Sequence, residues 1–204
     1  MTFADFTALI SNTADPVILL EGRRSIPEAS ADSAQRLASK LASRFGHLLF
    51  RSGNATGSDE AFAAGVIAIA PERLQIIAPD AGHRKKHRHP LVSYHFPESL
   101  DPDTLETIKG MTTAATPANR GLMKCYLRGA RTGAQAACLI RDTLKVAGLP
   151  GQLAPPVAAL FWIDPAEPQA GGTGHTIRAC RNASVPTIFQ NDWSTWLCES
   201  STHS

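Results

Sequence analysis

Two glycine-rich segments contain the residues whose types are best suited to binding an anion. Each segment lies between an apolar run and a stretch in which apolar residues recur at helical spacing. Glycine lets a ligand approach the backbone, and the free amides and the dipole of a helix N-terminus attract negative charge. The candidate ligand-binding residues of the first segment are Ser52, Gly53, Asn54, Thr56, Gly57, Ser58 and Asp59. Those of the second segment are Gly171, Gly172, Thr173, Gly174, His175, Thr176 and Arg178.

A second interpretation of these segments is structural, because Ser, Thr and Gly also favour the start of a helix. Two such segments in one chain, each directly after an apolar run, favour phosphate binding over simple capping. Within the second segment, the imidazole of His175 is able to bind a phosphate or to act as an acid or base near neutral pH. Asp164 ends an apolar run, a position from which a carboxylate can meet a ribose hydroxyl.

The elements that must position these residues alternate between strand-like and helix-like patterns. Strand, helix and strand in succession, with continuously apolar strands, predict a parallel sheet covered on both faces. We therefore expect an α/β fold, a Rossmann-like three-layer sandwich with a mainly parallel central sheet and helices on both faces. Ligands of such sheets bind at the carboxyl ends of the strands, where both glycine-rich segments begin. The apolar runs lie at 17–20, 48–50, 74–78, 157–163 and 185–189, and helical spacing is found at 28–45 and 60–70.

The length of 204 residues and the apolar content of 43% suit one hydrophobic core, so we expect a single domain over residues 1–204. Two parts of it interrupt the alternation. Residues 80–100 are polar, basic and punctuated by proline, which predicts a long loop or lid. Residues 101–150 predict a helical insertion, clearest at 132–146. A further short helix is expected to run through Asn182.

Two motifs resemble those of a known family. The run RSGNATGSDEAFAAG resembles the SGxAxGxD element of the DNA-processing protein A (DprA/Smf) family, and GGTGHTIRAC resembles that family's later Gly-Ser-x-x-Thr-x-Arg element. The family belongs to the SLOG superfamily, which also includes the Lonely Guy phosphoribohydrolases and sensors of nucleotide-derived ligands. The resemblance covers roughly residues 16–80 and 157–197.

The resemblance implies a ligand cleft with two walls. It assigns Ser52, Gly53, Gly57 and Asp59 to one wall, and Gly172, Thr173, Thr176 and Arg178 to the other. Arg23 corresponds to the arginine of the family's Gly-Ser-Arg turn after the first strand. Here that turn reads Glu21-Gly22-Arg23, so a carboxylate replaces the first small residue, while Gly22 and Arg23 stay candidate phosphate-binding residues.

The resemblance also bears on catalysis. Lonely Guy enzymes carry PGGxGTxxE, whose glutamate supports cleavage of the N-glycosidic bond, whereas residues 176–180 supply no carboxylate here. Cleavage by that mechanism would require another acid. The candidate catalytic residues are Asp59, Glu21 and Asp164.

The densest run of charge lies at residues 83–89, with three histidines and four permanent cations. Two interpretations are open. The segment is either a solvated loop or a site that binds the phosphates of a nucleotide or of single-stranded DNA. Few aromatic residues lie nearby to stack on bases, which weakens the case for single strands. No carboxylate or thiolate accompanies the histidines, and we expect neither a metal nor a cofactor. The candidate nucleic-acid contacts are Arg84, Lys85, Lys86 and Arg88.

A second group of charges lies on or before the helix expected at 132–146. A solvent-facing helix is the default interpretation, although Arg141 and Lys145 form a like-charge pair four residues apart that an anion would relieve. Trp193 and Trp196 are expected to attach the last helix to the sheet. The charges of this group are Arg128, Arg131, Arg141, Asp142 and Lys145.

The whole composition excludes some partners and leaves three functions open. A formal charge of +2 creates no global field for nucleic acid or membranes. Four cysteines without CxxC pairs, and the lack of a signal segment or membrane span, lead us to expect a cytoplasmic protein, and we also expect a homo-oligomer. The leading hypothesis is a sensor or binding module for a nucleotide-derived phosphate ligand. The alternatives are a nucleotide N-glycosidase of the same fold and a DprA-like protein that binds single-stranded DNA.

Overall fold

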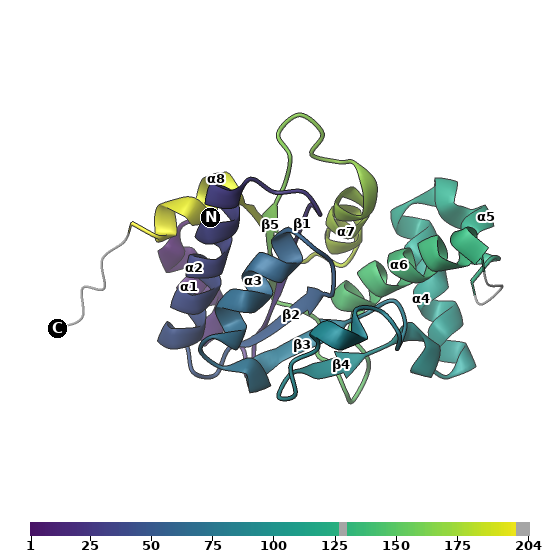
Figure 1. Ribbon diagram of the computed structural model, residues 1–204, viewed down its shortest axis with the longest axis horizontal. Helices are drawn as coiled ribbons and strands as arrows, with labels where there is room; N and C mark the ends of the chain where they lie inside the picture. The colour runs from purple at the N-terminus through teal and green to yellow at the C-terminus, as the bar shows by residue number, and fades with distance from the viewer. Residues whose placement is uncertain (127–129, 199–204) are drawn as a thin grey trace.

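The computed structural model describes residues 1–126 and 130–198, and the side chains of 130–132 are not described. Strands and helices alternate through most of this part of the chain (Figure 1). The strands are β1 (Val17–Gly22), β2 (Leu49–Gly53), β3 (Leu74–Ile77), β4 (Ser93–His95), β5 (Ala158–Trp162) and β6 (Thr187–Phe189). The helices are α1 (Phe3–Ser11), α2 (Glu28–Arg44), α3 (Ser58–Ile67), α4 (Pro102–Ala115), α5 (Arg120–Met123), α6 (Ala130–Ala147), α7 (Gly171–Asn182) and α8 (Gln190–Trp196).

Six strands of the described chain form one sheet in the order β4-β3-β2-β1-β5-β6, and every neighbouring pair is parallel. This arrangement confirms the predicted α/β, Rossmann-like class with its parallel central sheet. The chain builds the sheet outward from β1 to β4, then returns to the other side of β1 for β5. The order therefore reverses between β1 and β5, which leaves a crevice at the carboxyl ends of these two strands.

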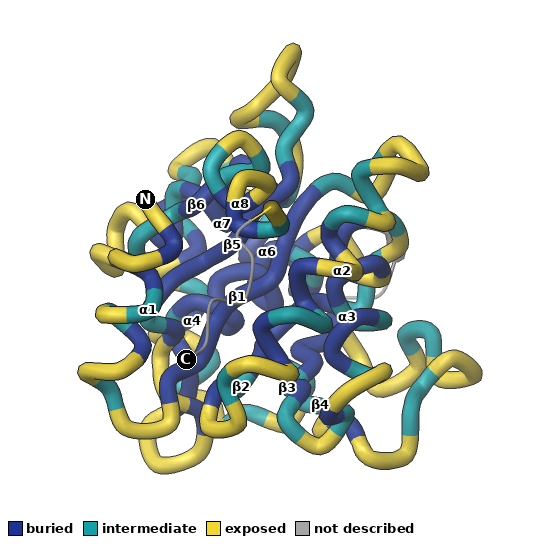
Figure 2. Tube along the Cα trace, turned by 90° about the vertical axis from the view of Figure 1, so that its left-hand side faces the viewer, coloured by how far each residue is buried: buried dark blue, intermediate teal, exposed yellow. Residues whose placement is uncertain are grey.

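Both faces of the sheet are covered by helices, and β1 shows why its sequence is continuously apolar (Figure 2). Ile18 and Leu20 belong to the core that includes side chains of α1, α2, α3 and α8. Leu19 points to the opposite face and packs in a core with residues of α6 and α7. Because alternate residues of a strand face opposite sides, a strand that is buried on both faces needs apolar side chains throughout. The tryptophans of α8, Trp193 and Trp196, are 1% and 0% exposed and belong to the first of these cores.

The structure corrects the expectation for residues 80–100. This segment contains the short η2 turn (Lys85–His87), but it also contains strand β4, which pairs with β3. Three residues are too few to show a periodic pattern, so no strand was predicted there. The strand is held by its partner, since Tyr94 packs against the core and Ser93 Oγ donates a hydrogen bond to the carbonyl of Leu74 at 3.3 Å.

The second glycine-rich segment is also placed differently from the expectation. Residues 171–176 do not form a turn that leads into a helix, because α7 begins at Gly171 and the segment is its first part. Helix α1 was not among the elements predicted from the sequence. In the described ranges, no helix has the combined length and apolarity that a membrane crossing would require.

Candidate functional site

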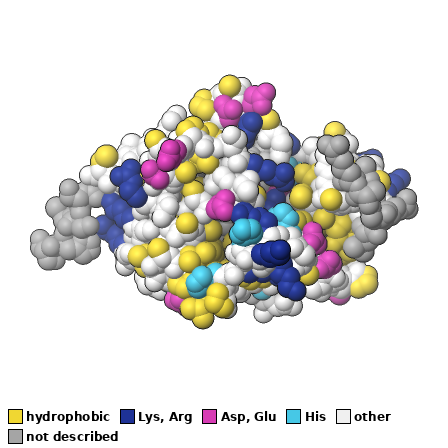
Figure 3. Space-filling view, viewed as in Figure 1, with side chains coloured by type: hydrophobic (Ala, Val, Ile, Leu, Met, Phe, Trp, Pro, Cys, Tyr) yellow, Lys and Arg dark blue, Asp and Glu magenta, His cyan; other side chains and the backbone are white. Residues whose placement is uncertain are grey.

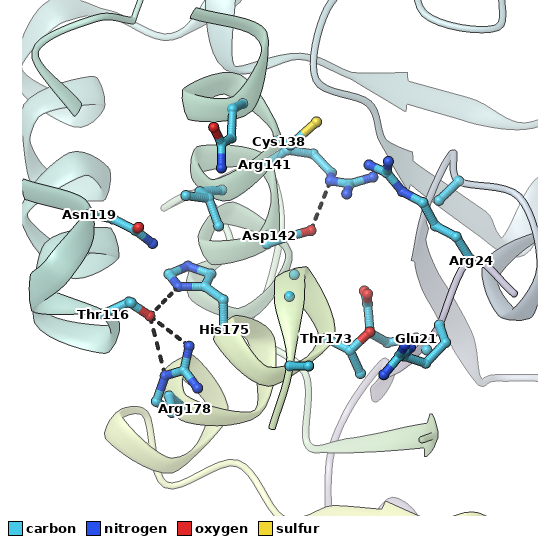
Figure 4. Close-up of a pocket in the computed structure, with 18 of the residues that line it drawn as sticks. Glu21, Arg24, Thr116, Asn119, Cys138, Arg141, Asp142, Thr173, His175 and Arg178 are labelled. Atoms are coloured by element: carbon cyan, nitrogen blue, oxygen red, sulfur yellow. Dashed lines mark hydrogen bonds and ion pairs between the residues drawn. The ribbon is translucent and has the colours of Figure 1, made fainter. Parts of the chain in front are cut away.

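A cleft of about 710 Å³ lies at the crevice between β1 and β5 (Figure 4). The end of β1 and the residues after it form one side, and the first turn of α7 forms another. Helix α6 supplies charged side chains to the remaining wall, and Thr116 and Asn119 come from the segment after α4. The lining residues that carry the argument below are Glu21, Gly22, Arg23, Arg24, Arg141, Asp142, Gly171, Gly172, Thr173, His175 and Arg178.

The N-terminus of α7 offers unused amide donors to this cleft. Ala170 is the N-cap, and no side chain caps the helix. The amide of Gly174 donates to Ala170 at 3.1 Å, but no described residue accepts a hydrogen bond from the amides of Gly171, Gly172 or Thr173. Since these residues line the cleft, their amides and the helix dipole are available to an anion.

Two glycines are needed for this helix start. Gly171 has a backbone φ angle of +61°, which residues other than glycine rarely adopt. At Gly172, a Cβ would stand 2.9 Å from Oδ2 of Asp142 on α6. The absence of a side chain therefore lets α7 approach α6 closely at the cleft.

Two arginines face each other across the cleft. Figure 4 shows the guanidinium groups of Arg24 and Arg141 pointing toward one another from different sides. Arg141 has a side chain only 5% exposed, and its Nε lies 2.9 Å from Oδ1 of Asp142. Arg24 is exposed and has no hydrogen-bond or ion-pair partner among residues 1–126 and 130–198. Facing cations repel one another, and an anion between them would relieve that repulsion.

A buried charge cluster lies beneath these arginines. Nζ of Lys145 donates to Oε2 of Glu21 and lies 3.0 Å from Oδ1 of Asp142. The side chains are 0%, 5% and 2% exposed, in that order. The prediction of a solvent-facing helix for Arg141, Asp142 and Lys145 is therefore wrong, because α6 turns these charges toward the sheet. Arg128 lies outside the described residues, and the side chain of Arg131 is not described.

The carboxyl groups of this cluster differ in how readily they ionise. Burial raises the pKa of Glu21 to about 8, and the nearby carboxyl of Asp59 acts in the same direction. Burial also raises the pKa of Asp59. Burial opposes ionisation of Asp142 as well, but the charges of Arg141 and Lys145 outweigh it and hold its pKa below the ordinary value. Of Glu21 and Asp142, only Asp142 is therefore ionised at neutral pH, so these two groups do not balance the charges of Arg141 and Lys145, which favours a further negative charge in the cleft.

None of the ligand residues predicted in the first glycine-rich segment lines this cleft, and from residues 52–59 only Ala55, which was not predicted, does so. Their side chains are mostly engaged with the protein. Oγ of Ser52 donates to Leu20 at 2.8 Å, and Oγ of Ser58 donates to Arg23 at 2.9 Å. Gly57 has φ of +78°, and a Cβ there would lie 2.4 Å from the carbonyl oxygen of Arg24. Thr56 is exposed, and Asn54 and Gly53 line a neighbouring cavity together with Asp59.

Within the second segment, several side chains brace the fold. His175 is 1% exposed, and its ring nitrogens Nδ1 and Nε2 lie 2.9 Å and 3.0 Å from the hydroxyls of Thr116 and Thr143. Burial lowers the pKa of His175, so its imidazole is neutral at physiological pH. Arg178 donates to the carbonyl of Ala115 at 3.0 Å and to the hydroxyl of Thr116 at 2.9 Å.

The remaining residues of the second segment make contacts within α7, with the preceding loop or with the cleft. Oγ1 of Thr176 donates to the carbonyl of Gly172 at 3.1 Å. Gly174 is packed so tightly that a Cβ would collide with the backbone of Gln169. Thr173 is 6% exposed and lines the cleft.

Arg23 and Asp164 hold the loop between β5 and α7. Nη1 of Arg23 lies 3.6 Å from a carboxylate oxygen of Glu167 and 3.9 Å from one of Asp164, and it donates to the carbonyl of Glu167 at 3.3 Å. Arg23 and Gly22 line the cleft, but Asp164 does not. Of these two candidate catalytic residues, Glu21 thus lines the cleft and Asp164 does not.

The basic segment at 83–89 lies away from this cleft, over β3 and β4, where Figure 3 shows cationic and histidine side chains gathered on one face. Nη2 of Arg84 lies 2.5 Å from Oε1 of Glu60, and the guanidinium of Arg88 lies 5.0 Å and 4.9 Å from the ring centres of Tyr94 and Phe96. These two cations are thus engaged with the protein. Lys85 and Lys86 are exposed.

Sequence reasoning did not assign Arg24, Thr116 or the charges of α6 to the site. The one available signal was the like-charge pair of Arg141 and Lys145, which is unfavourable on a solvated helix. Across the described ranges, no three or more His, Cys, Asp and Glu side chains are grouped as a metal site requires. Comparison of the chain with family models, with curated proteins and with solved structures finds no match.

Proposed function

We propose that this protein binds a nucleotide or nucleotide-derived phosphate ligand in the cleft between β1 and β5. The observation that carries the proposal is the convergence of three unused amides, at Gly171, Gly172 and Thr173, with the guanidinium groups of Arg24 and Arg141 on one cavity. Amides at a helix N-terminus bind phosphate oxygens, and guanidinium groups bind them in a bidentate manner.

The position and size of the cleft support a ligand larger than inorganic phosphate. Ligands of open α/β sheets bind where the strand order reverses, and this cleft lies at that point. Its volume of about 710 Å³ is in the usual range for sites of small organic molecules. A phosphate at α7 would therefore leave space for the rest of a nucleotide.

A binding or sensor role needs nothing further, but one observation favours an enzyme as the second candidate. Glu21 lines the cleft, and its raised pKa of about 8 keeps the carboxyl protonated at neutral pH. A protonated acid beside a bound nucleotide is able to donate a proton to a leaving group. The second candidate is thus a hydrolase or transferase that acts at a ribosyl bond, with Glu21 as its acid.

The test is a thermal-shift and calorimetric screen of mononucleotides, dinucleotides, cyclic nucleotides and ribose 5-phosphate, with chromatography of each hit for turnover. We expect at least one nucleotide to raise the melting temperature. Arg24→Gln should weaken binding about tenfold or more, because it removes a charge-assisted contact. Arg36→Gln, an exposed arginine on α2, is the matched control and should leave binding unchanged.

Two results would contradict the proposal. One is the absence of a shift with every nucleotide while short oligonucleotides bind with a steep dependence on salt, which would favour the binding of single-stranded DNA. The other is equal loss of affinity in the two arginine variants. Release of a free base from a nucleotide, lost in Glu21→Gln, would favour the enzyme over the sensor.

A further inference from the structure

A second cavity, of about 170 Å³, adjoins the cleft on the side of β2 and β3. Its walls are largely apolar and come from α3 and from the two strands. Arg84 and His87 of the basic segment lie at its rim, and Tyr94 adds an aromatic ring. The apolar wall residues are Ala63, Ala64, Ile67, Leu74 and Ile76.

One polar group of this cavity has no partner. Asp59 lines the cavity and is 2% exposed, and neither of its carboxylate oxygens has a partner within hydrogen-bond distance among the described residues, although the nearby amide of Ala55 acts to lower its pKa. Burial raises the pKa of Asp59, but donors from a ligand favour the ionised carboxylate, which can only accept hydrogen bonds. Buried polar groups without partners are rare. The dipole of α3 favours an acid in its first turn but supplies neither oxygen with a donor. Asp59 therefore has unused capacity for two donors.

The cavity and the cleft share one wall residue. Ala55 lines both of them. A Cβ on Gly53 would stand 2.6 Å from Oδ2 of Asp59 and 2.5 Å from Nη1 of Arg141, so the unpartnered acceptor and a cation of the cleft lie close to the same point. A ligand whose phosphate lies in the cleft thus has an apolar compartment with an acceptor directly beside it.

We infer that the second cavity holds the base of the ligand and that Asp59 selects guanine. This inference rests on the proposed function. Guanine presents two adjacent donors, N1–H and the N2 amino group, which match the two oxygens of a carboxylate. Adenine and cytosine place an acceptor beside their amino group, and that acceptor would face a carboxylate oxygen unfavourably. The apolar walls suit the flat faces of a purine.

Access to Asp59 requires side chains over it to move, because its oxygens are fully covered. The basic segment at the rim of the cavity is held in place by two sets of contacts. Arg84 pairs with Glu60, and Asn54 Nδ2 donates to the carbonyl of His83 at 3.2 Å while Nε2 of His83 lies 2.9 Å from the carbonyl of Asn54. Both contacts lie near the surface and can open without exposing the core.

The test compares dissociation constants of guanosine, inosine and adenosine 5′-monophosphates and of ribose 5-phosphate. We expect guanosine monophosphate to bind about tenfold or more tightly than adenosine monophosphate, with inosine monophosphate between them because it lacks the N2 amino group. Asp59→Asn should abolish this preference. Asp103→Asn, on the exposed start of α4, is the matched control.

A second variant fills the cavity. Ala63→Leu places a larger side chain in the apolar wall and should reduce the affinity for guanosine monophosphate to that for ribose 5-phosphate. Equal binding of the guanine and adenine nucleotides by the wild-type protein would overturn the inference while the proposed function stands. Failure of every nucleotide and of ribose 5-phosphate to bind would remove both.

Discussion

Lys145 on α6 contacts the carboxyl group of Glu21 at the end of β1, and both side chains are buried. Lys145 also lies 3.0 Å from Asp142. These contacts join α6 to the carboxyl edge of the sheet through polar groups, at the place where the strand order reverses. The same groups contribute to the electrostatics of the cleft, so the stability of the fold and the proposed ligand binding both involve one cluster.

Replacing the cation of this cluster should be costly. Lys145→Met removes one of the two buried cations beside the ionised Asp142, and breaking a buried ion pair typically costs about 3–5 kcal/mol of unfolding free energy. Urea unfolding followed by circular dichroism measures the loss. Lys109→Met is the control, because Lys109 forms a pair with the exposed Glu106 on α4 and should cost less than about 1 kcal/mol. Equal losses for the two variants would show that the buried cluster does not contribute as described.

The raised pKa of Glu21 predicts a specific dependence of stability on pH. Its folded value of about 8 lies above the ordinary value of 4.5, so between these values the folded state holds a proton that the unfolded state has released. This contribution to stability is complete below pH 4.5 and is lost as pH rises through 8, at a slope of at most about 1.4 kcal/mol per pH unit.

Glu21→Gln isolates this effect, because glutamine resembles the protonated acid and does not titrate. We expect its unfolding free energy near pH 4.5 to stay within about 1.5 kcal/mol of the wild-type value, since the hydrogen bond from Lys145 is retained. The difference between wild type and variant should grow in favour of the variant from pH 5 to pH 8. A constant difference over that range would contradict the raised pKa.

Much of the fold could be predicted from the sequence because local patterns determine it. Continuous apolar runs such as 17–20 and 157–163 signal strands that are buried on both faces, and the helices between them dictate parallel pairing. The three-residue β4 could not be predicted in this way. It depends on the exposed edge of β3 and on the packing of Tyr94, which are tertiary contacts without a local signature.

The site was only partly accessible from the sequence for a similar reason. The unused amides at Gly171 and Gly172 follow from a glycine-rich helix start, which is a local feature. Arg141 enters the cleft because α6 packs against both the sheet and α7, and Gly172 lets it approach. That arrangement joins residues about thirty positions apart, and a helical pattern alone does not tell which face of α6 meets the sheet.

Gly57 illustrates how a predicted ligand residue can have a role in folding. Its φ of +78° and its contact with the backbone of Arg23 and Arg24 leave no space for a side chain. Gly57→Ala should therefore lower the unfolding free energy by about 1–3 kcal/mol through backbone strain, as measured by urea unfolding. Gly110→Ala on the exposed face of α4, where a Cβ meets no atom within 4 Å, should instead raise it by about 0.5–1 kcal/mol. Stabilisation by both substitutions would contradict this role of Gly57.

The basic segment and the cleft should act independently. Lys85 and Lys86 are exposed and line neither the cleft nor the second cavity, so replacing both with alanine should change nucleotide affinity less than twofold. If short single-stranded DNA binds at all, the same double variant should weaken that binding and reduce its salt slope, because fewer counterions are released. Calorimetry at two salt concentrations measures both effects. A large loss of nucleotide affinity in this variant would move the phosphate site from the α7 N-terminus to the basic segment and would contradict the cleft as the binding site.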